Sequence, residues 1–262
     1  MPRKNNGFTI LEISIVLAVI ALIIGSIFLA QSMIRNAQVL SVIDDTNTYK
    51  QAIQLFKDKY QYLPGDMPTA ETFWGSDTNC PYTPYIDSPR TSTCNGNGDG
   101  HIASSTDSTW QMATESTRAW QQLANAGLIA GSYSGTNGVA VGGPGDLLVA
   151  FPGVNVPASQ IPGGGFSLWY INNASDTSSD WAGIGHILMF GGADANRYTD
   201  LPVLTTTEAY GIDTKIDDGL PATGNVRSEK YAPADDNCNA GAQYNTGSSL
   251  VNACALVFYL GF

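Results

Sequence analysis

The sequence predicts an α+β protein with a long N-terminal helical spine and a globular head that contains an antiparallel sheet. Two patterns carry this prediction. An apolar run near the N-terminus passes directly into an amphipathic helical pattern, and short apolar runs separated by Gly- and Pro-rich turns follow in the second half. A chain of 262 residues is long enough for one large domain with an appendage.

The composition argues against several classes of function. The chain has 12 Lys+Arg against 23 Asp+Glu and a formal net charge of −11, so we predict no nucleic-acid partner, which would require a basic surface. Two histidines leave little for His-based chemistry, and the sequence contains neither a Gly-x-Ser-x-Gly motif nor a phosphate-binding loop. We therefore do not expect an enzyme.

Residues 8–30 predict a membrane-spanning helix. Glu12 is the only ionisable side chain in this run, and a helix of this length spans ~30 Å, the thickness of a hydrocarbon core. Arg3 and Lys4 precede it, which predicts a cytoplasmic N-terminus and export of the rest of the chain. A secretory signal peptide fits poorly, because the run is too long and lacks a small-x-small cleavage site. A carboxylate in a membrane costs ~2.5–3.5 kcal/mol, so Glu12 is expected to have a partner.

The run Gly7-Phe8-Thr9-Ile10-Leu11-Glu12, with the apolar helix after it, resembles the N-terminal signature of type IV prepilins and type II secretion pseudopilins. The shared features are a short basic leader that ends in Gly, a Phe next, and a Glu at the fifth position after the break. The resemblance extends to about Ala30. It implies cleavage between Gly7 and Phe8 by a prepilin peptidase on the cytoplasmic face, and N-methylation of the Phe8 amine.

The resemblance also implies a partner for Glu12, namely the N-terminal amine of a neighbouring subunit during assembly. Breaking such a pair in a low dielectric strands a charge at a cost of ~3–5 kcal/mol, so the pair would set the register between helices. The resemblance further implies homo- and hetero-oligomers with other pilin-like subunits and an inner-membrane assembly platform. The protein would be a single-pass inner-membrane protein with a periplasmic head before it enters a pilus or pseudopilus fibre.

A second class of function stays open on the residues alone. A membrane-anchored periplasmic binding module, such as an adhesin or a lectin, would have the same anchor and would not polymerise. The sequence does not separate a pilus subunit from a secretion pseudopilus subunit, or a major from a minor one.

The chain divides into a leader at residues 1–7, the apolar half of the helix at 8–30, an amphipathic half at 31–63, and a head at 64–262. In the amphipathic half, the apolar positions recur at intervals of three and four: Val39, Val42, Ile43, Thr46, Tyr49, Ile53, Phe56, Tyr60 and Leu63. Pro64-Gly65 is expected to end this helix, near Tyr62.

Within the head, residues 64–108 are expected to be loop, and helices are expected at 109–126 and 206–216. Gly127 fits the position after the first of these helices, and Thr205 with Glu208 predicts a capping box for the second. Short apolar runs predict four strands: Leu147–Phe151, Phe166–Ile171, His186–Phe190 and Ala255–Leu260. His186 is expected to be a packed core residue of one of these strands.

The four cysteines all follow the membrane segment, in what would be an oxidising compartment. Their spacing lacks a Cys-x-x-Cys pair, so a zinc ribbon is not expected. Among the three possible connectivities, the nearest-neighbour pairing of Cys80 with Cys94 and Cys238 with Cys254 is preferred. Each such bridge would be worth ~3 kcal/mol in the chain-entropy treatment.

The run Asn95-Gly96-Asn97-Gly98-Asp99-Gly100-His101-Ile102 is the strongest candidate for a metal site. Its side-chain oxygens alternate at loop positions 1, 3 and 5, with Gly at 6, as in the first half of an EF-hand calcium loop. His101 would contribute its backbone carbonyl. The closing Glu is absent at position 12, and Asp107 or Glu115 could replace it. A calcium site is therefore expected here, with an ordinary Asn-Gly turn as the alternative.

A second acidic run, Asp213–Gly219, lies at the end of the helix expected at 206–216. Carboxylates near a helix C-terminus are unfavourable with its dipole, and a cation would relieve this. A solvated turn is the preferred interpretation.

Overall fold

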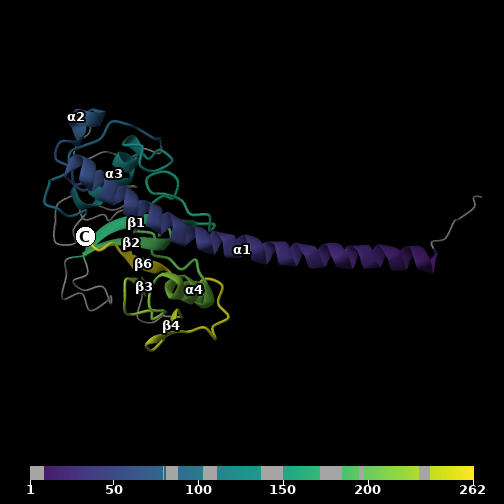
Figure 1. The fold of residues 1–262 in the computed structure, drawn as a ribbon. Coiled ribbons are helices and arrows are strands. Elements are labelled where there is room, and N and C mark those ends of the chain that lie inside the picture. Colours follow the sequence, from purple (N-terminus) through teal and green to yellow (C-terminus); the bar gives the residue numbers. More distant parts are fainter. Residues whose placement is uncertain are drawn as a thin grey trace, which may run out of the picture.

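The computed structural model describes residues 9–78, 80, 88–102, 111–136, 150–171, 185–194, 198–229 and 237–262. Four helices lie in this part of the chain: α1 (Ile10–Tyr60), α2 (Ala70–Trp74), α3 (Gln111–Asn125) and α4 (Thr206–Ile216). The strands are β1 (Gly164–Ile171), β2 (Gly185–Gly192), β3 (Val226–Ser228), β4 (Asn239–Ala240), β5 (Gln243–Tyr244) and β6 (Leu256–Tyr259). The predicted α+β architecture is confirmed (Figure 1).

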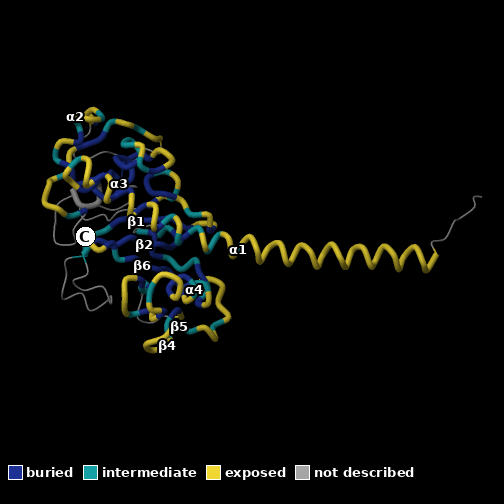
Figure 2. The backbone as a smooth tube through the Cα atoms, in the orientation of Figure 1, coloured by how far each residue is buried: buried dark blue, intermediate teal, exposed yellow. Residues whose placement is uncertain are grey.

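Helix α1 is one continuous helix with two different environments. Its first half projects away from the head, and its second half lies across the head (Figures 1 and 2). Its buried residues, which follow a helical period, are Val42, Thr46, Tyr49, Ala52, Ile53 and Phe56. The helix ends at Tyr60 because Gln61 adopts a left-handed conformation (φ 63°) and donates its backbone N–H to the Lys57 carbonyl at 2.8 Å.

The main sheet has four antiparallel strands in the order β1-β2-β6-β3. Three of the predicted strands correspond to β1, β2 and β6. The fourth, Leu147–Phe151, is not confirmed: residues 147–149 lie outside the described part, and Ala150 and Phe151 are not in a strand. Strand β3 was not predicted, because three residues are too short for an alternating pattern to show.

The core lies between the sheet, the second half of α1 and α3. Tyr49 of α1 meets Trp120 of α3 at 4.9 Å between ring centroids and Phe166 of β1 at 5.1 Å, both edge to face. Side chains alternate across the sheet, so Leu188 and Phe190 face this core while Ile187 and Met189 join a smaller cluster on the other face. One sheet face therefore holds the spine.

The two shorter predicted helices are confirmed, with one correction to the loop between them and α1. Gly127 follows α3 with φ 71°, and Leu128 donates its backbone N–H to the Leu123 carbonyl at 3.0 Å, which closes the helix. Thr205 and Glu208 form the predicted capping box of α4. The stretch expected to be loop at 64–108 contains the single-turn helix α2, which has too few residues for a periodic signal.

A bidentate ion pair joins α1 to α4 just beyond the apolar half of the spine. Arg35 Nε lies 2.6 Å from Glu208 Oε1, and its second nitrogen lies 2.8 Å from Glu208 Oε2 and 3.0 Å from the Val203 carbonyl. Burial opposes ionisation of Glu208, yet the hydrogen bonds from Arg35 and Thr205 lower its pKa. Glu208 therefore caps α4 and anchors it to the spine at once.

We expect Arg35→Met to destabilise the full chain in detergent by ~1–2 kcal/mol, because a half-buried carboxylate loses its charged hydrogen-bond donors. Arg35→Lys should lose part of this stability, since an ammonium cannot donate a planar fork. Thermal unfolding measures the effect. Lys50→Met, at an exposed position of the same helix, is the control, and equal losses in the two Met variants would contradict a specific role for the ion pair.

Candidate functional site

Gly7 and Phe8, between which cleavage is predicted, lie outside the described part of the chain. The described part begins at Thr9, which caps α1. Glu12 Oε2 accepts hydrogen bonds from the backbone N–H and the hydroxyl of Thr9, both at 2.8 Å, and Thr9 Oγ1 accepts from the Glu12 N–H at 3.2 Å. Within one chain, Glu12 is thus the acidic member of a capping box.

This capping role was not predicted, although the sequence carries a signal for it. Thr9-x-x-Glu12 has the spacing of a capping box, and it lies at the start of an apolar run that predicts a membrane-spanning helix. A negative charge in the first turn of a helix also interacts favourably with the helix dipole. Glu12 therefore has an intrachain partner as well as the intermolecular one that the resemblance implies.

The apolar half of α1 has no cover from the head. Its large apolar side chains are all exposed, from 46% for Ile20 to 89% for Ile10. By length and composition, α1 could cross a membrane, a property that a signal sequence or a soluble core helix can share. Since this stretch is unburied in the isolated chain, it is a surface that requires lipid or other protein.

The predicted metal loop, residues 95–101, is held at both ends. Cys94 precedes it in a disulfide, and Ile102 follows it, fully buried and donating its backbone N–H to His186 Nε2 at 3.2 Å. In between, Gly96 N–H donates to the Met67 carbonyl at 2.9 Å and Gly98 N–H to the Asp66 carbonyl at 3.0 Å. The loop therefore lies against the turn that follows α1.

The predicted ligands in this loop fall into different positions. Asn95 turns to α2, where its Oδ1 accepts from the Glu71 N–H at 2.9 Å. Asn97 and Asp99 are exposed and contact each other, with Asn97 Nδ2 donating to Asp99 Oδ2 at 2.9 Å. The His101 ring stacks on Tyr170 at 3.8 Å between centroids. The His101 backbone N–H donates to Asp99 Oδ1 at 2.8 Å, and its ring Nδ1 lies 3.7 Å from the same oxygen. The backbone carbonyl of His101 is the group that the sequence predicts as a ligand.

Two carboxylates from outside the loop lie against it. Glu115 of α3, which the sequence suggested as a closing ligand, is 4% exposed and accepts the Asn97 N–H at 3.1 Å. Asp66, which the sequence reading missed, is 1% exposed and accepts the Gly100 N–H at 3.0 Å through Oδ2. Burial raises the pKa of Asp66 to about 6, and the nearby charge of Asp99 adds to this. Sequence spacing gave no sign of Asp66, because only folding brings it to the loop.

Asp107, the other suggested closing residue, lies outside the described part.

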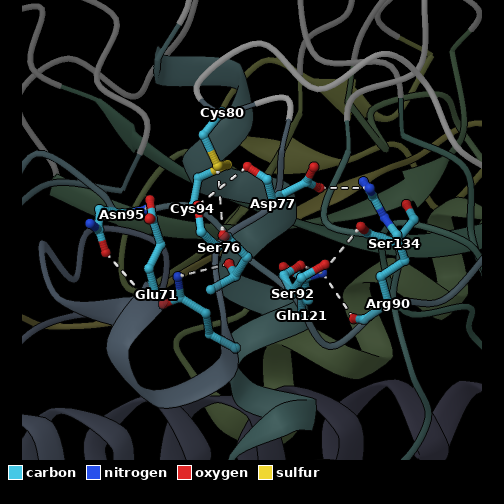
Figure 3. The surroundings of a disulfide bond; sticks show 12 residues. Glu71, Ser76, Asp77, Cys80, Arg90, Ser92, Cys94, Asn95, Gln121 and Ser134 are labelled. Atoms are coloured by element: carbon cyan, nitrogen blue, oxygen red, sulfur yellow. Dashed lines mark hydrogen bonds and ion pairs between the residues drawn. A yellow bond between two sulfur atoms is a disulfide. The ribbon is translucent and has the colours of Figure 1, made fainter.

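Both preferred disulfides are present, joining Cys80 to Cys94 and Cys238 to Cys254. Around the first, Arg90 Nη1 lies 2.6 Å from Asp77 Oδ2. Figure 3 shows this pair and the side chain of Gln121, which points toward the neighbouring backbone. Gln121 Nε2 donates to the carbonyls of Arg90, Ser92 and Ser134 at 2.9, 3.1 and 3.2 Å.

A buried cation lies in the same region. Arg118 is 2% exposed, and burial lowers its pKa to about 10 against the raising effect of Asp77, Glu115 and Glu71. Three carboxylates therefore act on this buried guanidinium, and one of them is the predicted closing ligand Glu115.

The second acidic run forms a compact turn. Asp213, Asp217 and Asp218 are the described acidic group whose oxygens lie within 4.8 Å of one another. Their oxygens already accept hydrogen bonds: Asp213 from Gly219 N–H and the Tyr244 hydroxyl, Asp217 from Val226 N–H, and Asp218 from Leu220 N–H and the Thr223 hydroxyl. This pattern agrees with the preferred interpretation as a turn.

His186 joins the metal loop to the C-terminal segment. Its Nε2 accepts the Ile102 N–H, so its Nδ1 must carry the proton and donate to the Phe262 carbonyl at 2.8 Å. Burial lowers the pKa of His186 to about 4, with smaller lowering effects from His101 and Lys57. The ring is therefore neutral at pH 7, as expected for a packed core histidine.

The comparisons with known proteins agree with the N-terminal geometry. Residues 2–28 match the prokaryotic N-terminal methylation motif, which is the prepilin-type signature of type IV pilin-like proteins. The comparisons with curated proteins and with solved structures found no significant match. The chain thus carries the processing and anchoring signature of pilin-like proteins ahead of a head for which these comparisons give no relative.

We expect the full chain to lose stability on acidification through His186. The folded pKa of about 4 lies below the unfolded value of ~6.5, so the neutral ring stabilises the fold above pH ~6.5 and this stability is lost as pH falls toward 4. The loss should reach ~2 kcal/mol at pH 5. His186→Gln keeps a donor and an acceptor without this titration, so urea unfolding should show a smaller acid loss for the variant. Parallel pH profiles would contradict the prediction.

Proposed function

We propose that this protein is a structural subunit of a type IV pilus-like or type II secretion pseudopilus fibre, processed by a prepilin peptidase and assembled through α1. The observation that carries the proposal is the methylation motif at residues 2–28, which runs directly into a helix whose apolar half the head leaves uncovered. The motif points to a structural subunit, and we assign the chain no catalytic role.

The proposed mechanism is a transfer of α1 from lipid to protein. Before assembly, lipid would cover the apolar half of α1. After assembly, the apolar halves of neighbouring subunits would cover it. Because lipid tails are as apolar as Leu or Ile, the transfer needs close packing and polar pairing in addition to hydrophobicity. Glu12 is the acidic group available for such pairing in the apolar half of α1.

The capping box supplies hydrogen-bond donors to the Glu12 carboxylate while the subunit is still in the membrane. In a single chain, its carboxylate is held by Thr9 at 2.8 Å, which lowers the cost of placing it in lipid. Cleavage after Gly7 would create a new amine one residue before Thr9. That amine would sit at the positive end of the helix dipole, where a carboxylate of a neighbouring subunit would neutralise it.

The proposed location follows from the same residues. Arg3 and Lys4 favour a cytoplasmic N-terminus, and the head would then lie in the periplasm of a bacterial cell. Two disulfides in the head are consistent with an oxidising compartment. Partners would be other pilin-like subunits, the peptidase and an inner-membrane assembly platform.

Intact mass and N-terminal sequencing of the protein from its native membrane test the processing step. We expect a chain that starts at Phe8 and is heavier by one methyl group than the unmodified sequence. A chain starting at Met1 or near Ala30 would overturn the proposal and leave an anchored or secreted binding module as the reading to pursue.

We expect Glu12→Ala to abolish incorporation into fibres while the protein still folds and enters the membrane, because the variant lacks the charge that would set register. Shearing fibres from cells and immunoblotting measures incorporation, and mass spectrometry shows whether processing persists.

Thr9→Ala is the matched control for Glu12→Ala. It removes the capping box at a cost of ~0.5–2 kcal/mol but keeps the carboxylate, so it should still assemble. Normal incorporation of Glu12→Ala would contradict the mechanism, and an equal defect in both variants would mean that Glu12 acts through the cap.

A further inference from the structure

Asp66 is a buried carboxylate with one oxygen unused. It is 1% exposed, and its Oδ2 accepts the Gly100 N–H at 3.0 Å. Its Oδ1 is also buried and has no hydrogen-bond partner among the residues that the structure describes. An unsatisfied charged oxygen is expensive to bury, because it loses its hydration without replacement. The backbone N–H groups of Gly98 and Asp99 also lie near this carboxylate and oppose the rise in its pKa, and Oδ1 is the carboxylate atom that a ligand could use.

The loop at 95–101 is built closely around this carboxylate. A Cβ at Gly96 would overlap the backbone of Gly65 and Asp66, so only glycine allows the loop to approach. Gly98 and Gly100 both have positive φ, at 74° and 85°, and turn the loop back over Asp66. The disulfide at Cys94 and the buried Ile102 hold its two ends.

Oxygen atoms from three further residues lie at this loop. Asn97 and Asp99 present exposed side chains, and Glu115 approaches from α3 with its Oε1 on the Asn97 N–H. Three carboxylates, those of Asp66, Asp99 and Glu115, therefore surround one short segment. Arg118 offsets part of the charge of Glu115. The repulsion between the carboxylates of Asp66 and Asp99 remains, and a bound cation would reduce it.

We propose that Asp66 and the loop 95–101 form a calcium site, with Asp66 Oδ1, the side chains of Asn97 and Asp99, Glu115, and the backbone carbonyl of His101 as its oxygen ligands. In the absence of a cation, the carboxylate oxygens of Asp66, Asp99 and Glu115 are farther apart than those of the Asp213 group. Asn97 Nδ2 donates a hydrogen bond to Asp99 Oδ2. Calcium binding would turn the exposed side chains of Asn97 and Asp99 toward Asp66. The loop backbone, held at Cys94 and Ile102, would keep its present position.

The donor set selects a hard cation. The cysteines are all in disulfides and both His186 nitrogens are engaged, so the atoms proposed as ligands are all oxygens. Ca²⁺ accepts six to eight oxygens in flexible geometry, whereas Mg²⁺ demands a compact octahedron and retains its waters. A site of mixed carboxylate, amide and carbonyl oxygens that closes by side-chain movement suits Ca²⁺.

Calorimetric titration of the chelator-treated full chain in detergent with CaCl₂ tests the site. We expect one Ca²⁺ per chain with a Kd of ~10⁻⁴ M or tighter, and MgCl₂ should bind more weakly. Asp99→Asn, at an exposed position, should fold normally and weaken calcium binding by about tenfold or more. Asp66→Asn should do the same, because an amide oxygen can still accept the Gly100 N–H.

Asp218→Asn is the matched control, since it makes the same change in the other acidic group and should leave calcium affinity unchanged. Absence of saturable binding by the folded wild-type chain would overturn the proposal. So would unchanged affinity in Asp99→Asn, or a loss of binding in Asp218→Asn, which would place the cation at the Asp213 group. Calcium binding by the head does not depend on N-terminal processing. The titration therefore tests the calcium site, and the mass measurement separately tests the proposed function.

Discussion

The head depends on the contact that Tyr49 makes with Trp120 and Phe166. The second half of α1, the inner face of the sheet and α3 each present an apolar surface that is incomplete alone, and all three are covered where these rings meet. Since α1 is continuous, this packing also sets the direction in which its apolar half leaves the head (Figure 1). The ion pair between Arg35 and Glu208 adds a second fixed point nearer the apolar half, so the spine is held at two places along its length.

Much of the remaining head is irregular, and polar contacts organise it. The irregular segments place apolar side chains such as Met67, Ile102 and Ile161 in the core, and their buried backbone groups also need hydrogen-bond partners, some of them side chains. Gln121 Nε2 donates to three carbonyls on two segments, and the His186 ring joins Phe262 to the loop that ends at Ile102. The Cys80–Cys94 disulfide closes a loop that contains Arg90 and Ser92, and the Cys238–Cys254 disulfide closes a separate loop. Each bridge restricts the unfolded chain as well as the folded one.

The proposed calcium site and the proposed assembly surface lie at opposite ends of α1. Glu12 is in its first turn, whereas Asp66 follows its last, and a helix of 51 residues is ~75 Å long. A cation at Asp66 would therefore stabilise the outer part of the head without touching the apolar half. This separation means that the helix can be buried among neighbouring subunits while the loop at 95–101 stays at the surface, where it is open to solvent ions.

The sequence by itself determined the elements whose signal is local. The apolar run and the period of α1, the capping box at Thr205, and the N-terminal motif all lie within short windows, where helix geometry and membrane thickness dictate the pattern. The nearest-neighbour disulfides were the preferred one of three connectivities that the sequence left open, and the structure confirms them. Only the tertiary structure decided that Asp66 is buried against a loop some 30 residues further along, that Asn95 faces α2, and that a strand forms at Val226. Such contacts join distant segments, and no local periodicity encodes them.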